Sequence, residues 1–258
     1  MGPTLDYEIR LWQAGHYYIA GVDEVGRGCL AGPVVAGAVI LPVDDRVICN
    51  VLRAANVRDS KKLSFRQREG LVPLIKEVAL GVAIGEASSG EIDAYGIVAA
   101  CRLAMARALR ALPTQPTALL IDGPRSGSFF SLDQRLMSDD EILQLFAPKT
   151  KNDSIISDIF GQVDSPLLCT QCNVVRGDSA SLSIAAAAII AKVYRDNFMI
   201  EVDSKFLGYG FASHKGYGTS AHLAALRKLG ATPIHRMTWK PLRELRMTQM
   251  ELDLEDKD

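Results

Sequence analysis

Two adjacent carboxylates near the N-terminus are the residues best suited to chemistry. Asp23 and Glu24 end an apolar run and are followed almost at once by Gly26-Arg27-Gly28. Carboxylates bind divalent cations, glycines let backbone N–H groups approach a ligand closely, and the arginine fork suits phosphate. The segment therefore indicates a metal and phosphate site, although an isolated acid pair would more simply be an acidic turn. Because neighbouring side chains of a regular strand point to opposite faces, both acids can share one site only if the strand breaks at Glu24.

Two further acids stand at the ends of predicted strands. Asp122 closes an apolar run and precedes Gly123, and Asp178 lies at the head of a long predicted helix. Four oxygen ligands with room for water suit Mg²⁺ or Mn²⁺ better than zinc, and such clusters catalyse phosphoryl chemistry. Each acid also has a local interpretation, as a turn residue for Asp122 and as a helix cap for Asp178. For Asp178 the cap and metal binding are equally consistent with the sequence, and both could hold.

Basic and aromatic residues elsewhere suggest contacts to nucleic acid. Residues 58–68 concentrate Lys and Arg, including Lys61 and Lys62, and could follow a phosphate backbone, although a charge run is more often a solvated face. Tyr217 lies between glycines beside His214 and Lys215 and could stack on a sugar or base. Taken alone, it would be a partly buried tyrosine with a satisfied hydroxyl. His214, His222 and His235 lack the spacing of zinc ligands to one another, and none of them is assigned as a ligand.

Short apolar runs and helical periodicities alternate along the chain and must position these residues. A Ser64 cap begins one predicted helix, which Pro73 could divide, and Ser88 with Glu91 fits a capping box that begins another. Alternating buried strands and helices predict an α/β sheet covered by helices. The predicted strands are 17–22, 32–41, 79–87, 117–122 and 173–178, the first two as a possible hairpin; the helices are 64–78, 88–112, 139–146, 179–202 and 220–229, with a loop at 211–219.

The composition is that of a soluble globular protein. The 258 residues are 48% hydrophobic, enough for one large domain or one domain with a small appendage. No apolar stretch reaches the roughly 20 residues that span a bilayer, and no signal sequence is visible, so no membrane helix and a cytoplasmic location are expected. Five scattered cysteines predict reduced thiols, and the lone Cys169-x-x-Cys172 is more simply coincidence than a metal or redox site.

The charge distribution is uneven. The net charge is −1, yet the tail at 249–258 is acidic and expected to be disordered, which leaves residues 1–248 at +3. The body of the protein is therefore mildly basic, as a nucleic-acid binder can be.

Five motifs in order resemble those of bacterial type 2 ribonuclease H, the ribonuclease HII family. The resemblance runs from about Ile19 to about Arg243, and chance agreement of all five motifs is implausible. They are GVDEVGRG at 21–28 with AGPVV at 31–35; DSKKL at 59–63; IDG at 121–123; GD at 177–178 with SIAAA at 183–187 and AKVYRD at 191–196; and HKGYGT at 214–219.

The resemblance implies a fold and a site. The expected fold is a ribonuclease H-like mixed five-stranded sheet flanked by helices at 16–205, followed by a small helical extension at 206–248. It implies that Asp23, Glu24, Asp122 and Asp178 bind two Mn²⁺ or Mg²⁺ ions during catalysis. It also implies that Gly26-Arg27-Gly28 faces a ribonucleotide 2′-OH while Tyr217 stacks on the adjoining deoxyribose. Lys61, Lys62 and Arg27 would position backbone phosphates.

The implied activity is endonucleolytic. Such an enzyme hydrolyses RNA in RNA–DNA hybrids and incises DNA at embedded ribonucleotides, leaving 3′-hydroxyl and 5′-phosphate ends, for ribonucleotide removal and primer processing. A type 3 ribonuclease H is a rival, but its extra N-terminal domain has no room in the roughly 16 residues before the first strand. A hybrid-binding protein without catalysis is disfavoured by the four acids. A monomer is expected; a sliding-clamp contact and the preferred metal are left open.

Two departures from the family pattern stand out. Cys29 occupies a position where proline is frequent. The span between Asp122 and Asp178 is also longer than usual, so residues 125–172 are expected to contain an insertion of unknown role.

Overall fold

Five strands form one mixed sheet in the computed structural model, which describes residues 2–43, 46–123, 138–146 and 170–245. The strands are β1 (Ile19–Val25), β2 (Val34–Ile40), β3 (Gly81–Ala87), β4 (Ala118–Asp122) and β5 (Thr170–Val174), in the order β3-β2-β1-β4-β5. β2 pairs antiparallel with β1 and β3, whereas β4 pairs parallel with β1 and β5. The predicted hairpin and the mixed five-stranded sheet are confirmed.

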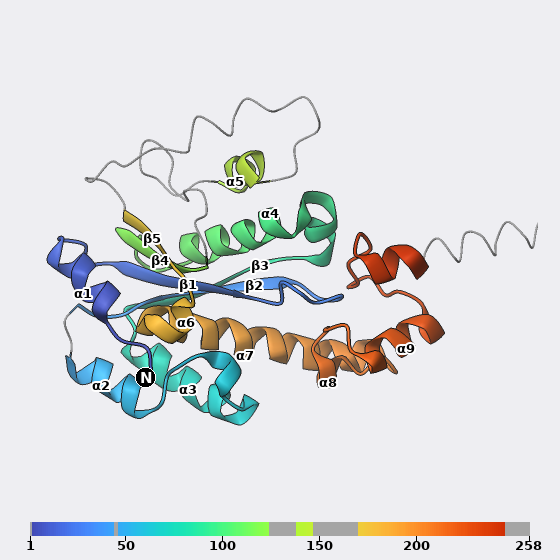
Figure 1. Cartoon of the computed structure of the whole chain (residues 1–258), viewed down its shortest axis with the longest axis horizontal. Helices are drawn as coiled ribbons and strands as arrows, with labels where there is room; N and C mark the ends of the chain where they lie inside the picture. Colours follow the sequence, from blue (N-terminus) through green and yellow to red (C-terminus); the bar gives the residue numbers. More distant parts are fainter. Residues whose placement is uncertain (1, 44–45, 124–137, 147–169, 246–258) are drawn as a thin grey trace, which may run out of the picture.

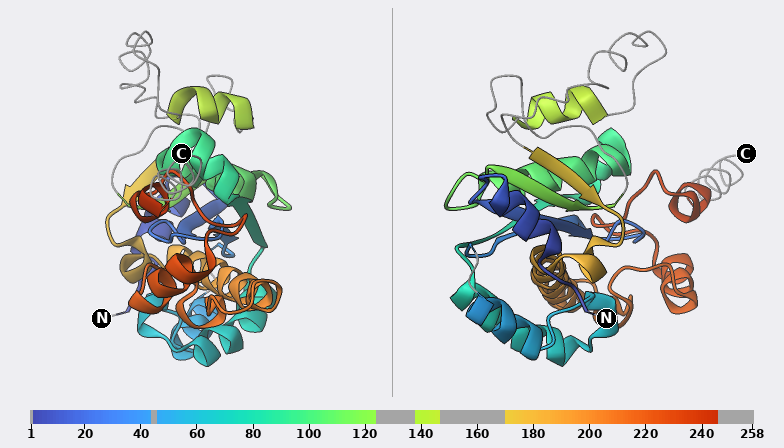
Figure 2. Two further views of the ribbon diagram at one scale, coloured as in Figure 1. Left: turned by 90° about the vertical axis from the view of Figure 1, so that its right-hand side faces the viewer. Right: turned by 60° about the vertical axis from the view of Figure 1, so that its left-hand side comes forward.

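Helices cover both faces of this sheet (Figure 1). On one face lie α4 (Ser89–Arg110) and α5 (Asp139–Phe146), and on the other lie α7 (Leu182–Lys205), α3 (Phe65–Val78) and α2 (Arg46–Ala54). The side chains of α1 (Asp6–Gln13) join the hydrophobic cluster on the α7 side. Beyond the end of α7, the chain forms α8 (Phe211–His214) and α9 (Ser220–Leu229), within the range predicted as a helical extension (Figure 2).

Strand alternation divides the core into two layers. Ala20 and Val22 of β1 join the cluster under α4, whereas Ile19 joins the cluster under α7. Two glycines let α7 approach the sheet closely, because a Cβ on Gly21 or Gly37 would lie 2.3 Å from backbone of Ser183 or 2.4 Å from backbone of Ala187. The first turns of α7 are therefore fixed against β1 and β2.

Several local predictions are confirmed and others are wrong. Ser64 and Ser88 form capping boxes, and Gly230 ends α9. Pro73 does not divide α3, because the buried Leu71 and Ile75 hold the helix against the core on both sides of it. The helices α1 and α2 and the short α8 were not expected, and β5 begins at Thr170, inside the predicted insertion.

The long helix predicted at 179–202 is two helices. The short α6 (Gly177–Ala180) is separated from α7 by Ser181, whose backbone is extended at φ −112° and ψ 134°. The N-terminal segment causes this break: Thr4 N–H donates to Ala180 O, and Leu182 N–H donates to Thr4 O, both at 2.9 Å. Two hydrogen bonds to the backbone of Thr4 thus replace two of the hydrogen bonds that a continuous helix would form.

The predictions for the cysteines, the insertion and the tail can be compared with the structure only in part. Cys29 and Cys101 are buried free thiols, and Cys172 is a free thiol within β5. Cys169, most of the predicted insertion and the acidic tail lie outside the described residues. Among those that are described, no helix combines the length and hydropathy needed to cross a bilayer.

Candidate active site

The first two acids lie in a strand that remains regular. β1 continues to Val25, and Asp23 and Glu24 pair in register with Gly37 and Ala36 of β2. β1 therefore does not break at Glu24, which was the condition expected for the two acids to share one site. The two carboxylates point to opposite faces, Asp23 toward α7 and Glu24 toward α4, and the charge of Asp122 raises the pKa of each.

Asp122 is the acid that lies next to both. Val22 is paired with Ile121 in the parallel register between β1 and β4. The next residues of the two strands, Asp23 and Asp122, therefore lie side by side. Burial raises the pKa of Asp23 well above its usual value, and the charges of Glu24, Asp122 and Asp178 raise it further. Burial also raises the pKa of Glu24, with Arg27 opposing the rise and Asp122 adding to it. The carboxylates thus repel one another at a site that is partly removed from solvent.

Asp178 joins this cluster through α6. Asp122 Oδ1 accepts the backbone N–H of Gly177 at 2.6 Å, which fixes the residue before Asp178 to the end of β4. The N-cap of α6 is Arg176, in a left-handed conformation, and that of α7 is Ser181, so the interpretation of Asp178 as a helix cap is wrong. Burial raises the pKa of Asp178, the charge of Asp59 adds to the rise, and Lys61 opposes it.

Each carboxylate has a partner within the protein. Asp23 Oδ1 accepts Glu24 N–H at 2.8 Å, and Arg27 lies 3.5 Å from Glu24 Oε1. Lys61 Nζ lies 3.7 Å from Asp178 Oδ2. In this arrangement no three His, Cys, Asp or Glu side chains of the described residues form a ready-made metal site. The four acids nevertheless fit a hard divalent cation as a donor set, because all their ligand atoms are oxygens and their mutual repulsion would be relieved by positive charge.

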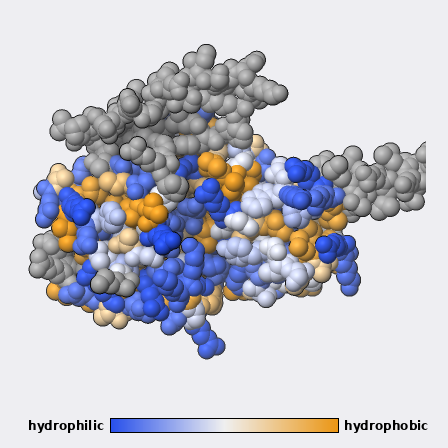
Figure 3. All heavy atoms as spheres, viewed as in Figure 1, coloured by the Kyte–Doolittle hydropathy of each residue, from blue (hydrophilic) through white to orange (hydrophobic). Residues whose placement is uncertain are grey.

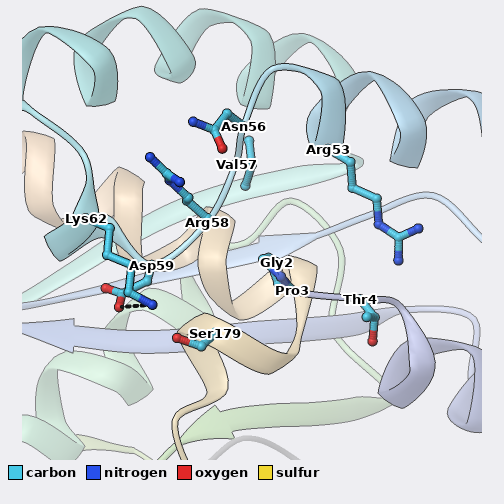
Figure 4. Close-up of a pocket in the computed structure, with 10 residues that line it drawn as sticks. All are labelled: Gly2, Pro3, Thr4, Arg53, Asn56, Val57, Arg58, Asp59, Lys62 and Ser179. Carbon is cyan, nitrogen blue, oxygen red and sulfur yellow. Dashed lines mark ion pairs between the residues drawn. The ribbon is translucent and has the colours of Figure 1, made fainter.

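Basic residues lie directly beside the acids. Asp59 caps the short helix η1 (Ser60–Lys62) by accepting Lys61 N–H at 3.0 Å, and Lys62 pairs with Asp59 at 3.5 Å. A pocket of about 610 Å³ opens next to them, lined by Arg53, Arg58 and Lys62 on one side and by Ser179 and the N-terminal residues on the other (Figure 4). The surface around α3 is largely hydrophilic (Figure 3). The sequence pointed to Lys61 and Lys62, but Arg53 lies outside the run at 58–68 and was missed.

The glycine turn is held from beneath by two buried arginines. Arg236 donates to Gly26 O at 2.6 Å and to Arg27 O at 2.9 Å. Gly26 has φ +88°, and a Cβ there would lie 2.1 Å from Nε of Arg195. The turn therefore requires glycine at 26, while the Arg27 side chain, 57% exposed, remains on the surface. Arg195 and Arg236 were not identified as functional from the sequence, because their role depends on carbonyl groups far along the chain.

Tyr217 lies beside this turn. Leu30 N–H, just beyond the turn, donates to Gly216 O at 2.8 Å. The Tyr217 side chain is 41% exposed, and Lys192 Nζ lies 5.9 Å from its ring centroid. Burial raises the pKa of Tyr217, and the neighbouring Cys29 thiol adds to the rise. The departure from the family pattern at Cys29 thus lies in contact with the tyrosine, and the structure brings the turn and the aromatic residue together.

Comparison with known protein families decides the identity of the fold and its activity. The sequence model of the family described as Ribonuclease HII matches residues 20–242. The chain belongs to the ribonuclease HII family. The ribonuclease HII of Roseiflexus castenholzii is 42% identical over 240 residues, covering 93% of this chain and 89% of the relative. The protein is accordingly a ribonuclease H, an endonuclease that degrades the RNA strand of RNA–DNA hybrids.

Solved structures show the same fold. The ribonuclease H2 of Pyrococcus horikoshii matches with a TM-score of 0.62 at 24% identity, covering 89% of this chain and 97% of that one. Bst-RNase HIII in complex with Mn²⁺ matches with a TM-score of 0.57 at 21% identity, covering 92% of this chain and 71% of that one. Part of the type 3 enzyme therefore has no counterpart in this chain.

Proposed function

We propose that this ribonuclease HII family member incises duplex DNA at embedded ribonucleotides, in addition to degrading RNA in hybrids. The cut falls on the 5′ side of the ribonucleotide at the RNA–DNA junction and leaves 3′-hydroxyl and 5′-phosphate ends. The observation that supports this proposal is the position of the Gly26-Arg27-Gly28 turn and of Tyr217, side by side and continuous with the strand that carries Asp23 and Glu24.

Four carboxylates hold the metal in this proposal. Asp23, Glu24, Asp122 and Asp178 bind two divalent cations, Mn²⁺ or Mg²⁺, and a solved type 3 relative carries Mn²⁺. When bound, such ions stabilise the charge that develops on the phosphate and lower the pKa of an attacking water. The raised pKa values of Asp23 and Asp178 support the assignment, because burial and then the neighbouring carboxylates disfavour negative charge there, and a bound cation would offset both effects. The side chains would exchange their present partners, Lys61 among them, for the ions.

Lys61 would then become available to the substrate. Its side chain is 80% exposed, so it can turn from Asp178 to a nearby phosphate. Lys62 and Arg27 would contact the backbone on either side, and the pocket lined by Arg53 and Arg58 extends this basic path away from the acids. Such contacts fix the register of the duplex without reading its sequence.

Discrimination between ribose and deoxyribose falls to the turn and the tyrosine. The 2′-OH can donate and accept hydrogen bonds, and the turn at Gly26-Arg27-Gly28 allows the backbone to approach it closely. The Tyr217 ring would stack on the next sugar, where a second 2′-OH would clash. One ribonucleotide followed by deoxyribose therefore satisfies both elements, which explains a preference for junctions. A monomeric state and a cytoplasmic location remain predictions from the sequence.

A cleavage map tests this proposal. Duplex DNA with one ribonucleotide, end-labelled on the modified strand, is incubated with the protein and with Mg²⁺, Mn²⁺ or chelator. We expect one metal-dependent cut on the 5′ side of the ribonucleotide and a product with a 3′-hydroxyl. The matched duplex with deoxyribose at that position should stay intact. Cleavage of the all-DNA duplex, or no cut in either metal, would refute the proposal.

A further inference from the structure

A chain of hydrogen bonds runs from Thr232 to Tyr217 through two buried histidines. Thr232 N–H donates to His235 Nδ1 at 2.9 Å, and His235 Nε2 lies 3.1 Å from His222 Nε2. His222 Nδ1 lies 2.9 Å from Tyr217 O. His222 and His235 are 0% and 2% exposed. The chain therefore ends on the backbone of the residue assigned to stack on the sugar.

The hydrogen-bond partners at the two ends determine every proton in this chain. A backbone N–H can only donate, so His235 Nδ1 accepts from Thr232 N–H and also from the Thr232 hydroxyl at 2.8 Å, which puts the His235 proton on Nε2. His235 Nε2–H then donates to His222 Nε2, which leaves the proton of His222 on Nδ1. That proton points to Tyr217 O, which can only accept. Both rings must be neutral, since an added proton on either would set two N–H groups against each other.

The residue after His235 holds the other recognition element. Arg236 donates to the carbonyl oxygens of Gly26 and Arg27 and also to Gly32 O at 2.9 Å. A β-bridge between His235 and Ala31 fixes the dipeptide beneath the end of the same turn. Two adjacent side chains thus connect to the two recognition elements. Arg236 binds the carbonyl groups of the Gly26-Arg27-Gly28 turn, and His235 is linked through His222 to the backbone of Tyr217.

We propose that the His235–Arg236 dipeptide is the positioning element that sets the Tyr217 backbone relative to the Gly26-Arg27-Gly28 turn, and with it the preference for RNA–DNA junctions. This inference rests on the recognition roles assigned under the proposed function. It assigns to His222 and His235 a specificity role without contact to substrate, because a displaced Tyr217 ring would distinguish deoxyribose from a second ribose less well.

The surroundings keep both imidazoles neutral. The titratable groups that face the pair are His214, stacked on His222 with centroids 4.2 Å apart, and Tyr209, whose hydroxyl donates to Gly230 O at 2.7 Å. His214 accepts Gly216 N–H on Nδ1 and contacts Tyr209 O with Nε2. Burial, with the charge of His222 as the next cause, lowers the pKa of His235 to about 4. The hydrogen-bond chain is therefore complete at neutral pH.

A spectroscopic measurement tests the chain in the unmodified protein. In protein labelled with ¹⁵N-histidine, correlation spectra between ring nitrogens and carbon-bound protons identify which nitrogen carries the proton. At neutral pH we expect His222 protonated on Nδ1, the rarer tautomer, and His235 on Nε2. Signals from His222→Gln and His235→Gln variants assign the rings. A His222 ring protonated on Nε2, or on both nitrogens, would overturn the hydrogen-bond chain.

Two variants of His235 test the positioning role. His235→Asn can still accept Thr232 N–H but is too short to donate to His222, whereas the longer His235→Gln can place an amide near the lost Nε2–H. The readout is the ratio of kcat/KM on a one-ribonucleotide duplex to kcat/KM on a continuous RNA–DNA hybrid. Loss of one buried hydrogen bond should lower this ratio about tenfold in His235→Asn, with partial recovery in His235→Gln.

Tyr209→Phe is the matched control. It removes hydrogen bonds from the same aromatic cluster without touching the chain to Tyr217. We expect it to lower the melting temperature and leave the ratio unchanged. A ratio in His235→Asn within about twofold of the wild type, or an equal fall in Tyr209→Phe, would overturn the positioning role. If the wild-type protein itself showed no preference for the junction, the proposed function would fail instead.

Discussion

Asp122 accepts the backbone N–H of Gly177 at 2.6 Å, and this bond joins the end of β4 to the residue that precedes Asp178. Two acids that are far apart in the sequence are thereby held in one cluster. Glycine at 177 also leaves room for this close approach. A Cβ there would lie 3.1 Å from Asp122 Oδ1 and 2.6 Å from Cδ1 of Ile184.

Gly177→Ala should therefore impair catalysis by displacing Asp122. The added methyl group presses on the carboxylate from the side of α6, and overpacking of this kind costs about 1–3 kcal/mol in stability. We expect kcat/KM on an RNA–DNA hybrid to fall about tenfold or more under saturating metal. Gly90→Ala is the control, because Gly90 is exposed in the first turn of α4 and a Cβ there meets a single neighbour at 3.9 Å. Equal activity of the two variants would refute the role of Gly177.

Asp23→Asn should stabilise the metal-free protein while abolishing cleavage. The pKa of Asp23 is higher in the folded protein than in the unfolded chain. Between these two pKa values, the folded protein therefore holds a proton that the unfolded chain has already lost. The resulting penalty is present above the raised pKa and vanishes below the usual value of 3.8. An uncharged amide removes it, and the free energy of unfolding at pH 7 should rise by on the order of 1 kcal/mol.

Chemical denaturation in chelator at pH 7 and near pH 3 measures this effect. The gain from Asp23→Asn should be present at pH 7 and shrink on acidification. Glu69→Gln, on the exposed side of α3, should change stability at neither pH. A destabilised Asp23→Asn at pH 7 would contradict the crowding of negative charge at the site.

The basic pocket predicts a salt effect on binding. If Arg53 and Arg58 contact phosphates, each alanine substitution should weaken binding to duplexes of any sequence. The slope of log K against log salt should fall in magnitude by about 1 for each lost contact. Lys76→Ala, an exposed cation on α3, serves as the control and should leave the slope unchanged. An unchanged slope in Arg53→Ala and Arg58→Ala would place the duplex elsewhere.

Two substitutions of Tyr217 can separate the effect of ring stacking from that of the hydroxyl group. Tyr217→Phe keeps the ring and loses only the contact with the Cys29 thiol, so its cleavage of a one-ribonucleotide duplex should stay close to that of the wild type. Tyr217→Ala loses the stack, and kcat/KM on that duplex should fall about ten- to a hundredfold. General binding to the duplex should fall less. If both variants cleave like the wild type, Tyr217 does not contact the sugar.

Local features of this fold were predictable from the sequence, and contacts between distant segments were not. Ser64 and Ser88 begin helices because their partners lie three residues away, and the apolar runs before Asp23 and Asp122 specify neighbouring strands. The break at Ser181 depends instead on Thr4, whose partner Ala180 lies 176 residues away. Within residues 179–202, only the serine at 181, whose side chain accepts Ile184 N–H, marks the start of α7.

The candidate site shows the same division. The acids and the glycine turn were visible because residue type alone suggested metal and phosphate. Their geometry was not: β1 stays regular at Glu24, so the two carboxylates reach Asp122 from opposite faces of the sheet rather than from one side of a broken strand. The histidines were set aside for lacking zinc-ligand spacing, and their roles became visible only through partners brought together by the tertiary fold.

Cleavage by Asp122→Asn tests the central claim most directly. The amide keeps the size of the side chain and an oxygen that can accept Gly177 N–H, but it removes the charge from the acid that lies next to both Asp23 and Glu24. Wild type and variant are compared on one-ribonucleotide duplex with Mg²⁺ or Mn²⁺, with binding measured separately in chelator. The predicted result is loss of cleavage in both metals with binding retained; turnover close to the wild-type rate would contradict the four-carboxylate metal site.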